Sequence, residues 1–204
     1  MKTDPFSDAW AFLIGATPDH VSLGLLRYPF VALYAAMLVA SVVIARANWH
    51  RDPAQRTAAG LWTLLFRVLM GSMWFQGSTW KLPLPVSAGL QYWTEQMADH
   101  AAFPFIAGLV RSLVLPNMVL FDPVILVVEL GLAVSFILGI LVRPAAALGA
   151  LYALGLWIGL YRHPAEWAWT YIFIAIVHGQ FAVHVAGHSL GLDALIRTDK
   201  GERA

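Results

Sequence analysis

Five apolar runs, each close to the length that crosses a lipid bilayer, dominate the pattern of this chain. They cover approximately residues 23–45, 58–78, 124–142, 145–160 and 170–188. A helix needs about 20 mainly apolar residues to cross the hydrocarbon layer. The pattern therefore predicts an all-α integral membrane protein with five spans.

The second and third runs are separated by a long stretch, residues 81–122, that is interrupted by prolines. Its section 101–115 is apolar but too short to cross a bilayer comfortably, which favours an interfacial or re-entrant helix. We expect the stretch to form a cap on the extracytoplasmic side. The first 19 residues lack the basic and then apolar pattern of a cleavable signal, and this predicts a retained interfacial segment.

Basic residues indicate how the spans are oriented. The first loop holds Arg46, Arg51 and Arg56, and the C-terminal tail holds Arg197, Lys200 and Arg203. Short loops rich in Lys and Arg stay in the cytoplasm. With an odd number of spans, the N-terminus is expected outside and the C-terminus in the cytoplasm. The expected parts are 1–56 (interfacial segment, first span and loop), 57–197 (a four-helix bundle with the cap 81–122) and the tail 198–204.

The composition of the chain is typical of an integral membrane protein. Hydrophobic residues make up 59% and charged residues 12%, whereas soluble domains carry about 25% charged residues. The net charge is +1, and no basic cluster alternates with aromatic residues, so nucleic acid is not an expected partner. The chain has no cysteine, which excludes a thiol relay, a disulfide or an iron–sulfur cluster of its own.

Two charges stand well inside apolar runs, Arg67 in the second and Glu129 in the third. A charge at the centre of a membrane costs about 2.5–3.5 kcal/mol, so such a residue usually faces the bundle interior and has a partner. We expect Arg67 and Glu129 to meet. At 100° per residue, Trp74 and Lys81 share the face of Arg67, and Gln76 lies opposite. The pair is either a structural ion pair or a site for a quinone carbonyl or a small anion.

The fifth run carries Gln180, His184 and His188 at four-residue spacing, with His178 on nearly the opposite side. Histidine can bind haem or a metal ion. No other run contains a histidine, so we expect no intrinsic haem or metal site, and interhelical hydrogen bonds for His178 and His184. His184 is kept as a candidate cofactor contact. Gly131, Ser135 and Gly139, and likewise Gly155 and Gly159, are spaced as in close helix packing.

Three segments resemble the DoxX superfamily of membrane proteins. Arg67-Val-Leu-Met-Gly71, with Gly77 and Lys81-Leu, resembles its first-helix signature. Glu129-Leu-Gly131 and Leu138-Gly139-Ile-Leu-Val-Arg143-Pro144 resemble its second helix and the start of its third. Gly187-His-Ser-Leu-Gly191-Leu-Asp193 resembles the C-terminal motif of the DoxD branch. The resemblance covers about residues 61–197; the run 23–45 is additional, and His188 stands where that motif has Arg.

The resemblance implies a four-helix transmembrane bundle, here with one additional N-terminal span. The DoxD branch is the large membrane subunit of thiosulfate:quinone oxidoreductase. By resemblance, we expect the membrane subunit of a quinone-linked oxidoreductase in a bacterial inner membrane, with a second membrane or periplasmic redox subunit; a homo-oligomer is left open. Arg67 and Lys81 would attract an anion or polarise a quinone carbonyl, Glu129 would hold Arg67 and relay a proton, and Trp74 would stack on the head group. Asp193 matches the family's terminal acidic position.

Two other classes compete with this interpretation. One is a non-catalytic membrane anchor or assembly factor of a redox complex, favoured by the extra span and the absence of cysteine. The other is a small-solute transporter, which the sequence supports less, because no paired broken helices indicate an inverted repeat.

Overall fold

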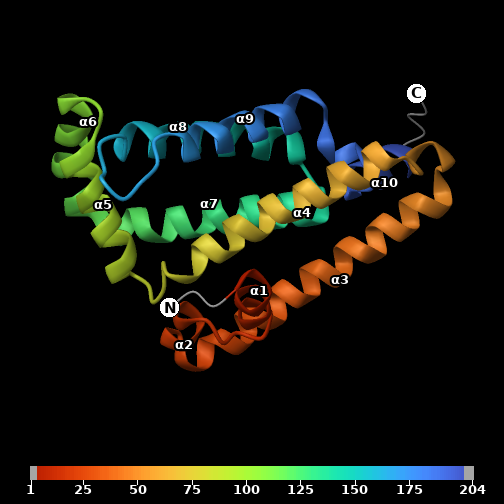
Figure 1. Ribbon diagram of the computed structural model, residues 1–204, viewed down its shortest axis with the longest axis horizontal. Coiled ribbons are helices and arrows are strands. Elements are labelled where there is room, and N and C mark those ends of the chain that lie inside the picture. Colours follow the sequence, from red (N-terminus) through yellow and green to blue (C-terminus); the bar gives the residue numbers. More distant parts are fainter. Residues whose placement is uncertain (1–3, 200–204) are drawn as a thin grey trace.

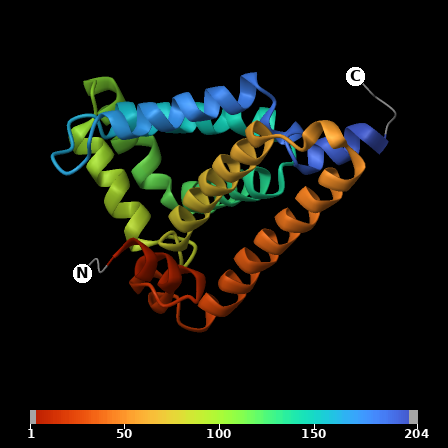
Figure 2. The same cartoon turned by 45° about the vertical axis from the view of Figure 1, so that its right-hand side comes forward.

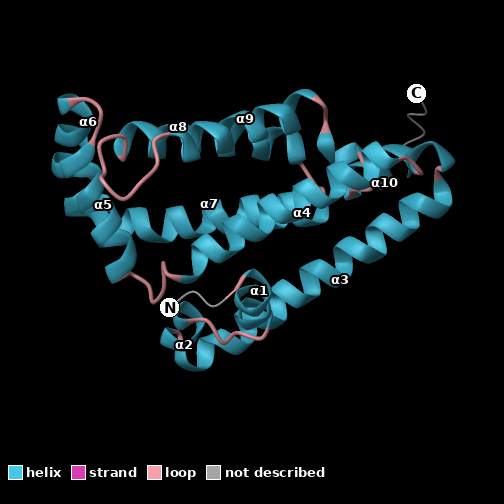
Figure 3. Ribbon diagram, viewed as in Figure 1, coloured by secondary structure: helices cyan, strands magenta, loops and turns pink. Residues whose placement is uncertain are grey.

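The computed structural model describes residues 4–199, and within them every regular element is helical (Figures 1 and 3). The α-helices are α1 (Pro5–Leu13), α2 (Pro18–Ser22), α3 (Arg27–Arg51), α4 (Ala58–Thr79), α5 (Ala88–His100), α6 (Pro104–Leu109), α7 (Met118–Leu138), α8 (Val142–Gly159), α9 (Trp169–Val183) and α10 (Leu192–Asp199). A π-helical turn, Val110–Val114, and a short 3₁₀ turn, Leu115–Asn117, join α6 to α7. Lys2 and most of the expected tail 198–204 lie outside the described residues.

Four helical stretches of the described chain are long and apolar enough to cross a membrane. They are Gly24–Arg51, Ala58–Thr79, Pro104–Leu138 and Val142–Gly159, and α9 is a shorter apolar helix. The expectation of an all-α, multi-pass membrane protein is confirmed at this level. The fifth apolar run gives a shorter helix than expected, because α9 ends at Val183 and the chain then turns. At 1.5 Å per residue α9 is only about 22 Å long.

The helices α8 and α9 run alongside each other, and α3 and α4 share a tilt that is oblique to them (Figures 1 and 2). α4 packs against α7, and α8 packs against α9. Gly71 lets α4 and α7 approach closely, since a Cβ there would lie 2.7 Å from Ile137 Cγ1 and 2.9 Å from the Ala133 carbonyl oxygen. The helices α4 and α7 run in opposite directions. Gly71 faces Ala133 and Ile137, whereas Gly77, which comes later in α4, faces Glu129, which comes earlier in α7.

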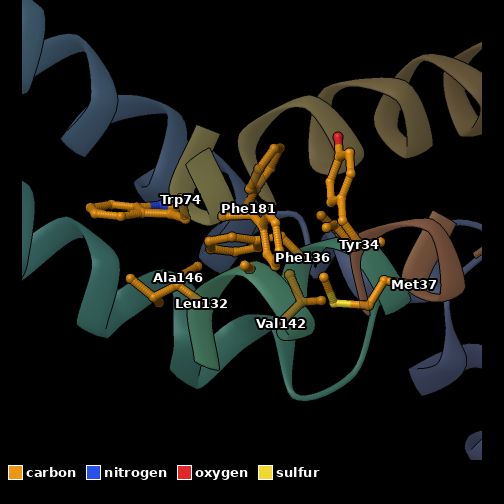
Figure 4. Close-up of a cluster of buried hydrophobic side chains, with 12 residues drawn as sticks. Tyr34, Met37, Trp74, Leu132, Phe136, Val142, Ala146 and Phe181 are labelled. Atoms are coloured by element: carbon orange, nitrogen blue, oxygen red, sulfur yellow. The ribbon is translucent and has the colours of Figure 1, made fainter. Parts of the chain in front are cut away.

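The core lies where these helices meet, and α3 contributes to it from the side (Figure 4). Phe75, Ala133, Phe136 and Ile137 are completely buried. Tyr34 of α3 stacks on Phe75, with ring centroids 4.8 Å apart, and its hydroxyl donates to Ser72 Oγ at 2.6 Å. Aromatic pairs in this geometry add about 0.5–1.5 kcal/mol beyond burial. They hold the first half of α3 on the bundle.

The two ends of the bundle differ in cover and in charge. The helices α5 and α6, in green in Figure 1, lie across one end, which we call the capped end. This is the stretch for which the sequence predicted a cap. At the other end α3 ends, α4 begins and α7 turns into α8. We call it the basic end, because it carries the cations of the last turns of α3, of the α3–α4 connection and of the α8 N-terminus: Arg46, Arg51, Arg56 and Arg143.

A tight turn at the basic end joins α7 to α8. Gly139 ends α7 with φ +72°, a conformation that glycine adopts without a steric penalty. The Asp193 carboxylate then accepts hydrogen bonds from the backbone N–H groups of Leu141 (2.8 Å) and Val142 (3.2 Å), which caps α8. Asp193 N–H donates in turn to the Gly139 carbonyl at 2.8 Å. The C-terminal segment thus fixes the start of α8.

Candidate functional site

Glu129 forms its ion pair with Lys81, and the predicted pair of Glu129 with Arg67 is wrong. The distance from Lys81 Nζ to Glu129 Oε2 is 2.6 Å, and the two side chains are 2% and 4% exposed. Arg67 instead lies opposite Phe136, which is about two turns along α7 from Glu129. The antiparallel register of α4 and α7 therefore brings the end of α4, and not its middle, to Glu129.

The Lys81 ammonium is held on several sides. Besides contacting Glu129, it donates to the Gly77 carbonyl at 2.7 Å and lies 3.6 Å from the centroid of the Trp80 ring. Burial lowers the pKa of Lys81, and the nearby carboxylate of Glu129 opposes that change. An ammonium has three N–H donors. Glu129 and Gly77 occupy two of them.

Tyr152 of α8 completes this cluster, and the sequence analysis missed it. Its hydroxyl donates to Glu129 Oε1 at 2.9 Å. Tyr152 is a hydroxyl-bearing residue inside the apolar α8, and such a group in a membrane helix usually finds a polar partner. That signal could have directed attention to it, although it does not say which helix supplies the partner.

A cavity of about 580 Å³ opens beside the ion pair toward the capped end. We call it the capped-end cavity; it is lined by Lys81, Glu129 and Tyr152, by the rings of Trp74, Trp80, Trp93 and Tyr171, and by aliphatic side chains and Gly155. Ligand pockets are typically 300–1,000 Å³, mostly apolar, with a few placed polar groups. The cavity fits this description. It suits a flat or elongated apolar molecule with one polar group directed at Lys81.

Trp74 is held in the cavity wall by His178 of α9. Trp74 Nε1 donates to His178 Nε2 at 3.0 Å, and His178 Nδ1 lies 2.7 Å from the Ile174 carbonyl oxygen. These two contacts assign a neutral imidazole with its proton on Nδ1. The expectation that His178 makes an interhelical hydrogen bond is confirmed. Gly149 makes room for it, because a Cβ there would collide with the imidazole ring.

Asp122, a second residue that the sequence analysis missed, anchors the cap helix. It is completely buried near the start of α7, and its Oδ2 accepts a hydrogen bond from Ser87 N–H. Ser87 is the N-cap of α5, and its own Oγ accepts from Leu90 N–H at 3.2 Å. Asp122 thereby fixes the cap over the cavity. It also lies close enough to Lys81 to act on its charge.

Arg67 belongs to the basic end and not to the cavity. It is completely buried, and its Nη1 donates to the Phe136 carbonyl at 2.7 Å. Within residues 4–199, its Nε and Nη2 have no hydrogen-bond partner, and Asp193 is the carboxylate that acts on its charge. Gly139 packs against this guanidinium and against Gly191. Residues from three segments that are distant in the sequence, around Arg67, Gly139 and Asp193, thus meet at the basic end.

His184 lies away from both charged clusters. It follows the last residue of α9, is exposed, and does not line the capped-end cavity. The predicted stripe of Gln180, His184 and His188 is wrong, because the helix ends at Val183 and His188 sits in a separate 3₁₀ turn. In the part of the chain that the structure describes, no three His, Cys, Asp or Glu side chains come together as metal ligands.

Fold and site define a class: a helical, multi-pass membrane protein with a buried Lys–Glu–Tyr cluster at the wall of an aromatic cavity. Compared with known proteins, the chain matches no family model, no curated protein and no solved structure.

Proposed function

We propose that this chain is the quinone-binding membrane subunit of an oxidoreductase, with the quinone head group in the capped-end cavity. The observation that carries the proposal is the buried ammonium of Lys81, which lines the cavity beside several aromatic rings. Glu129 and Gly77 contact this ammonium, the Trp80 ring centroid lies 3.6 Å from it, and most of the other residues that line the cavity are aromatic or aliphatic. A quinone is a flat apolar ring whose carbonyl oxygens accept hydrogen bonds, and it meets both features of the cavity.

In this proposal each side chain has a task that follows from its position. Lys81 donates to one quinone carbonyl, and the rings of Trp74 and Trp80 contact the head group. Glu129, held between Lys81 and Tyr152, lies where a proton can pass to the reduced quinone. Reduction to the quinol takes two electrons and two protons. The chain has no cysteine, so a partner subunit would supply the electrons; by resemblance, the donor is thiosulfate, two of which give tetrathionate and two electrons.

We further propose five spans, with α9 as the fifth, in a bacterial inner membrane. The termini then lie on opposite sides, with the basic end in the cytoplasm, as the distribution of Lys and Arg indicates. The capped end, with its cavity, would face outward and meet a periplasmic donor subunit.

Quinone binding tests the proposal directly. The purified chain in mild detergent is titrated with a short-chain ubiquinone or menaquinone, and tryptophan fluorescence reports binding because three tryptophans line the cavity. Gly155→Leu should abolish binding by filling the cavity, since a Cβ at Gly155 meets no atom within 4 Å. Gly179→Leu is the matched control: Gly179 has equal room but does not line the cavity.

Lys81→Gln tests the hydrogen bond to the quinone carbonyl. A hydrogen bond from a charged group contributes about 1.5–3 kcal/mol, so the affinity should fall at least about tenfold. Quinone affinity that is unchanged in both Gly155→Leu and Lys81→Gln would exclude this cavity as the quinone site.

A non-catalytic anchor for a redox complex is the second candidate, and one surface favours it. Phe103 and Phe105 stack at the capped end with centroids 5.7 Å apart, yet they are 50% and 71% exposed. Exposed aromatic side chains of this kind are typical of contacts with another subunit. A stoichiometric partner that copurifies with the wild-type chain and is lost from a Phe103→Ser/Phe105→Ser variant, together with no quinone binding, would select this function.

A further inference from the structure

A second cavity lies far from the ion pair, between α3 and α4. These helices are neighbours in the sequence and touch through the Tyr34–Ser72 hydrogen bond. From there to the basic end, α3 stands away from α4 (Figure 2). The space between them is a groove of about 870 Å³. We call it the α3–α4 groove; Leu38, Val42 and Ala45 line it on one side, and Leu61, Leu65 and Val68 on the other.

The mouth of the groove at the basic end is cationic and amphipathic. Arg46, Trp49 and His50 line it there, and none of the described residues that line the groove is acidic. Arg46 and His50 are four residues apart on α3 and therefore share a face. Both side chains are exposed. Tryptophan is enriched where the hydrocarbon layer meets the head groups, so Trp49 indicates the level of the lipid phosphates.

We propose that the α3–α4 groove binds an anionic phospholipid. One or more acyl chains lie against the leucine and valine side chains, and the phosphodiester lies between Arg46 and His50. Basic pockets between transmembrane helices on the cytoplasmic side bind anionic head groups, by attraction between the arginine and the phosphate. An apolar groove with a cationic mouth and no carboxylate complements such a lipid along its whole length. A zwitterionic lipid would place its own cation beside Arg46.

The lipid has a structural consequence for α3. Near the basic end, the helix is tied to the bundle through Asn48, whose Nδ2 donates to the Gly191 carbonyl at 2.9 Å. An acyl chain in the groove adds apolar contact between α3 and α4 where the protein itself provides little. The anionic lipid therefore stabilises the attachment of α3 to the bundle.

Lipid binding by the delipidated full chain in a neutral detergent tests the proposal. Native mass spectrometry and thermal unfolding are recorded with added dioleoyl phosphatidylglycerol, dioleoyl phosphatidylcholine or glycerol 3-phosphate. We expect phosphatidylglycerol alone to bind with one-to-one stoichiometry and to raise the unfolding temperature. An Arg46→Gln/His50→Gln variant should lose roughly tenfold in affinity. Ala45→Phe, which fills the groove and keeps both basic residues, should also lose the lipid.

Arg143→Gln is the matched control, because Arg143 is an exposed arginine at the same end that does not line the groove. Its affinity for phosphatidylglycerol should stay within about twofold of the wild type. An equal loss in Arg143→Gln would reduce the effect to general surface charge and overturn the proposal. Equal stabilisation by phosphatidylcholine or by glycerol 3-phosphate would also overturn it. A cross-link between two copies, through cysteines introduced at position 42, would overturn it as well, because a second chain would then occupy the groove. Gly155→Leu leaves this groove intact, so a failure here is distinguishable from a failure of the quinone site.

Discussion

The Lys81–Glu129 pair allows a double-mutant cycle whose outcome depends on its burial. Glu129→Gln keeps an acceptor for Tyr152 but removes the carboxylate that contacts the buried Lys81 ammonium, and leaves Asp122 to act on that charge. Lys81→Met keeps the length of the stem but removes the ammonium beside the buried Glu129 carboxylate, which keeps its hydrogen bond from the Tyr152 hydroxyl. With side chains only 2% and 4% exposed, each single change should cost about 3–5 kcal/mol. The double variant removes both charges and should cost less than either single one.

The assay is thermal unfolding in mild detergent, followed by tryptophan fluorescence, with the four proteins compared under identical conditions. For a chain of this size, 1 kcal/mol shifts the midpoint by about 2–4 °C, so each single variant should unfold roughly 10 °C lower. Arg111 and Asp99 supply the control cycle: their contact is 2.7 Å, but the side chains are 57% and 58% exposed. Their coupling should be below about 1 kcal/mol. Additive losses in the Lys81–Glu129 cycle would refute the buried pair.

Three further predictions concern residues outside this pair. Gly149→Ala should push the imidazole of His178 away and cost about 1–3 kcal/mol in thermal unfolding, whereas Gly179→Ala, with open space around it, should be near neutral. Asp193→Asn keeps one of the two acceptor oxygens of the α8 cap and removes the charge near Arg67, and should cost about 2 kcal/mol; an unchanged midpoint would contradict both roles. Burial lowers the pKa of His20 below 6.5, so the unfolded segment binds the proton first and the docked α1–α2 segment loses stability as the pH falls below about 6.5. The protection factor of α1 in hydrogen exchange, which is the intrinsic exchange rate at each pH divided by the observed rate, should therefore fall from pH 7.5 to pH 5 in the wild type but not in His20→Asn.

The sequence predicted the position of a helix correctly where a capping residue marks the start of the apolar run. The second run, predicted at 58–78, is α4, Ala58–Thr79, because Thr57 caps its start by accepting from Gly60 N–H at 3.0 Å. The face of α4 that carries Arg67 was also predicted correctly: Arg67, Trp74 and Lys81 are buried, whereas Gln76 is exposed. Helical periodicity fixes which residues share a face.

Partners across helices could not be obtained in the same way. Periodicity does not give the register between two helices, and Arg67 and Glu129 were paired because they were the obvious opposite charges. The register is set by close packing at Gly71. The small-residue pattern predicted close helix packing at Gly131 and Gly155, and this prediction is wrong for both. A Cβ at either position would meet nothing within 4 Å. Spacing alone cannot distinguish a glycine that faces a helix from one that faces open space.

The two charged clusters fix the same register of α4 against α7 from opposite ends. Arg67 donates to the Phe136 carbonyl at the basic end, and Lys81 meets Glu129 at the capped end. A slide of one helical turn, about 5.4 Å, would break both contacts and expose two buried cations to apolar surroundings. Gly71 allows the close contact between these two sites. Because the register is held twice, Lys81 stays at the cavity wall before any ligand arrives, and its ammonium is preorganised rather than recruited by binding.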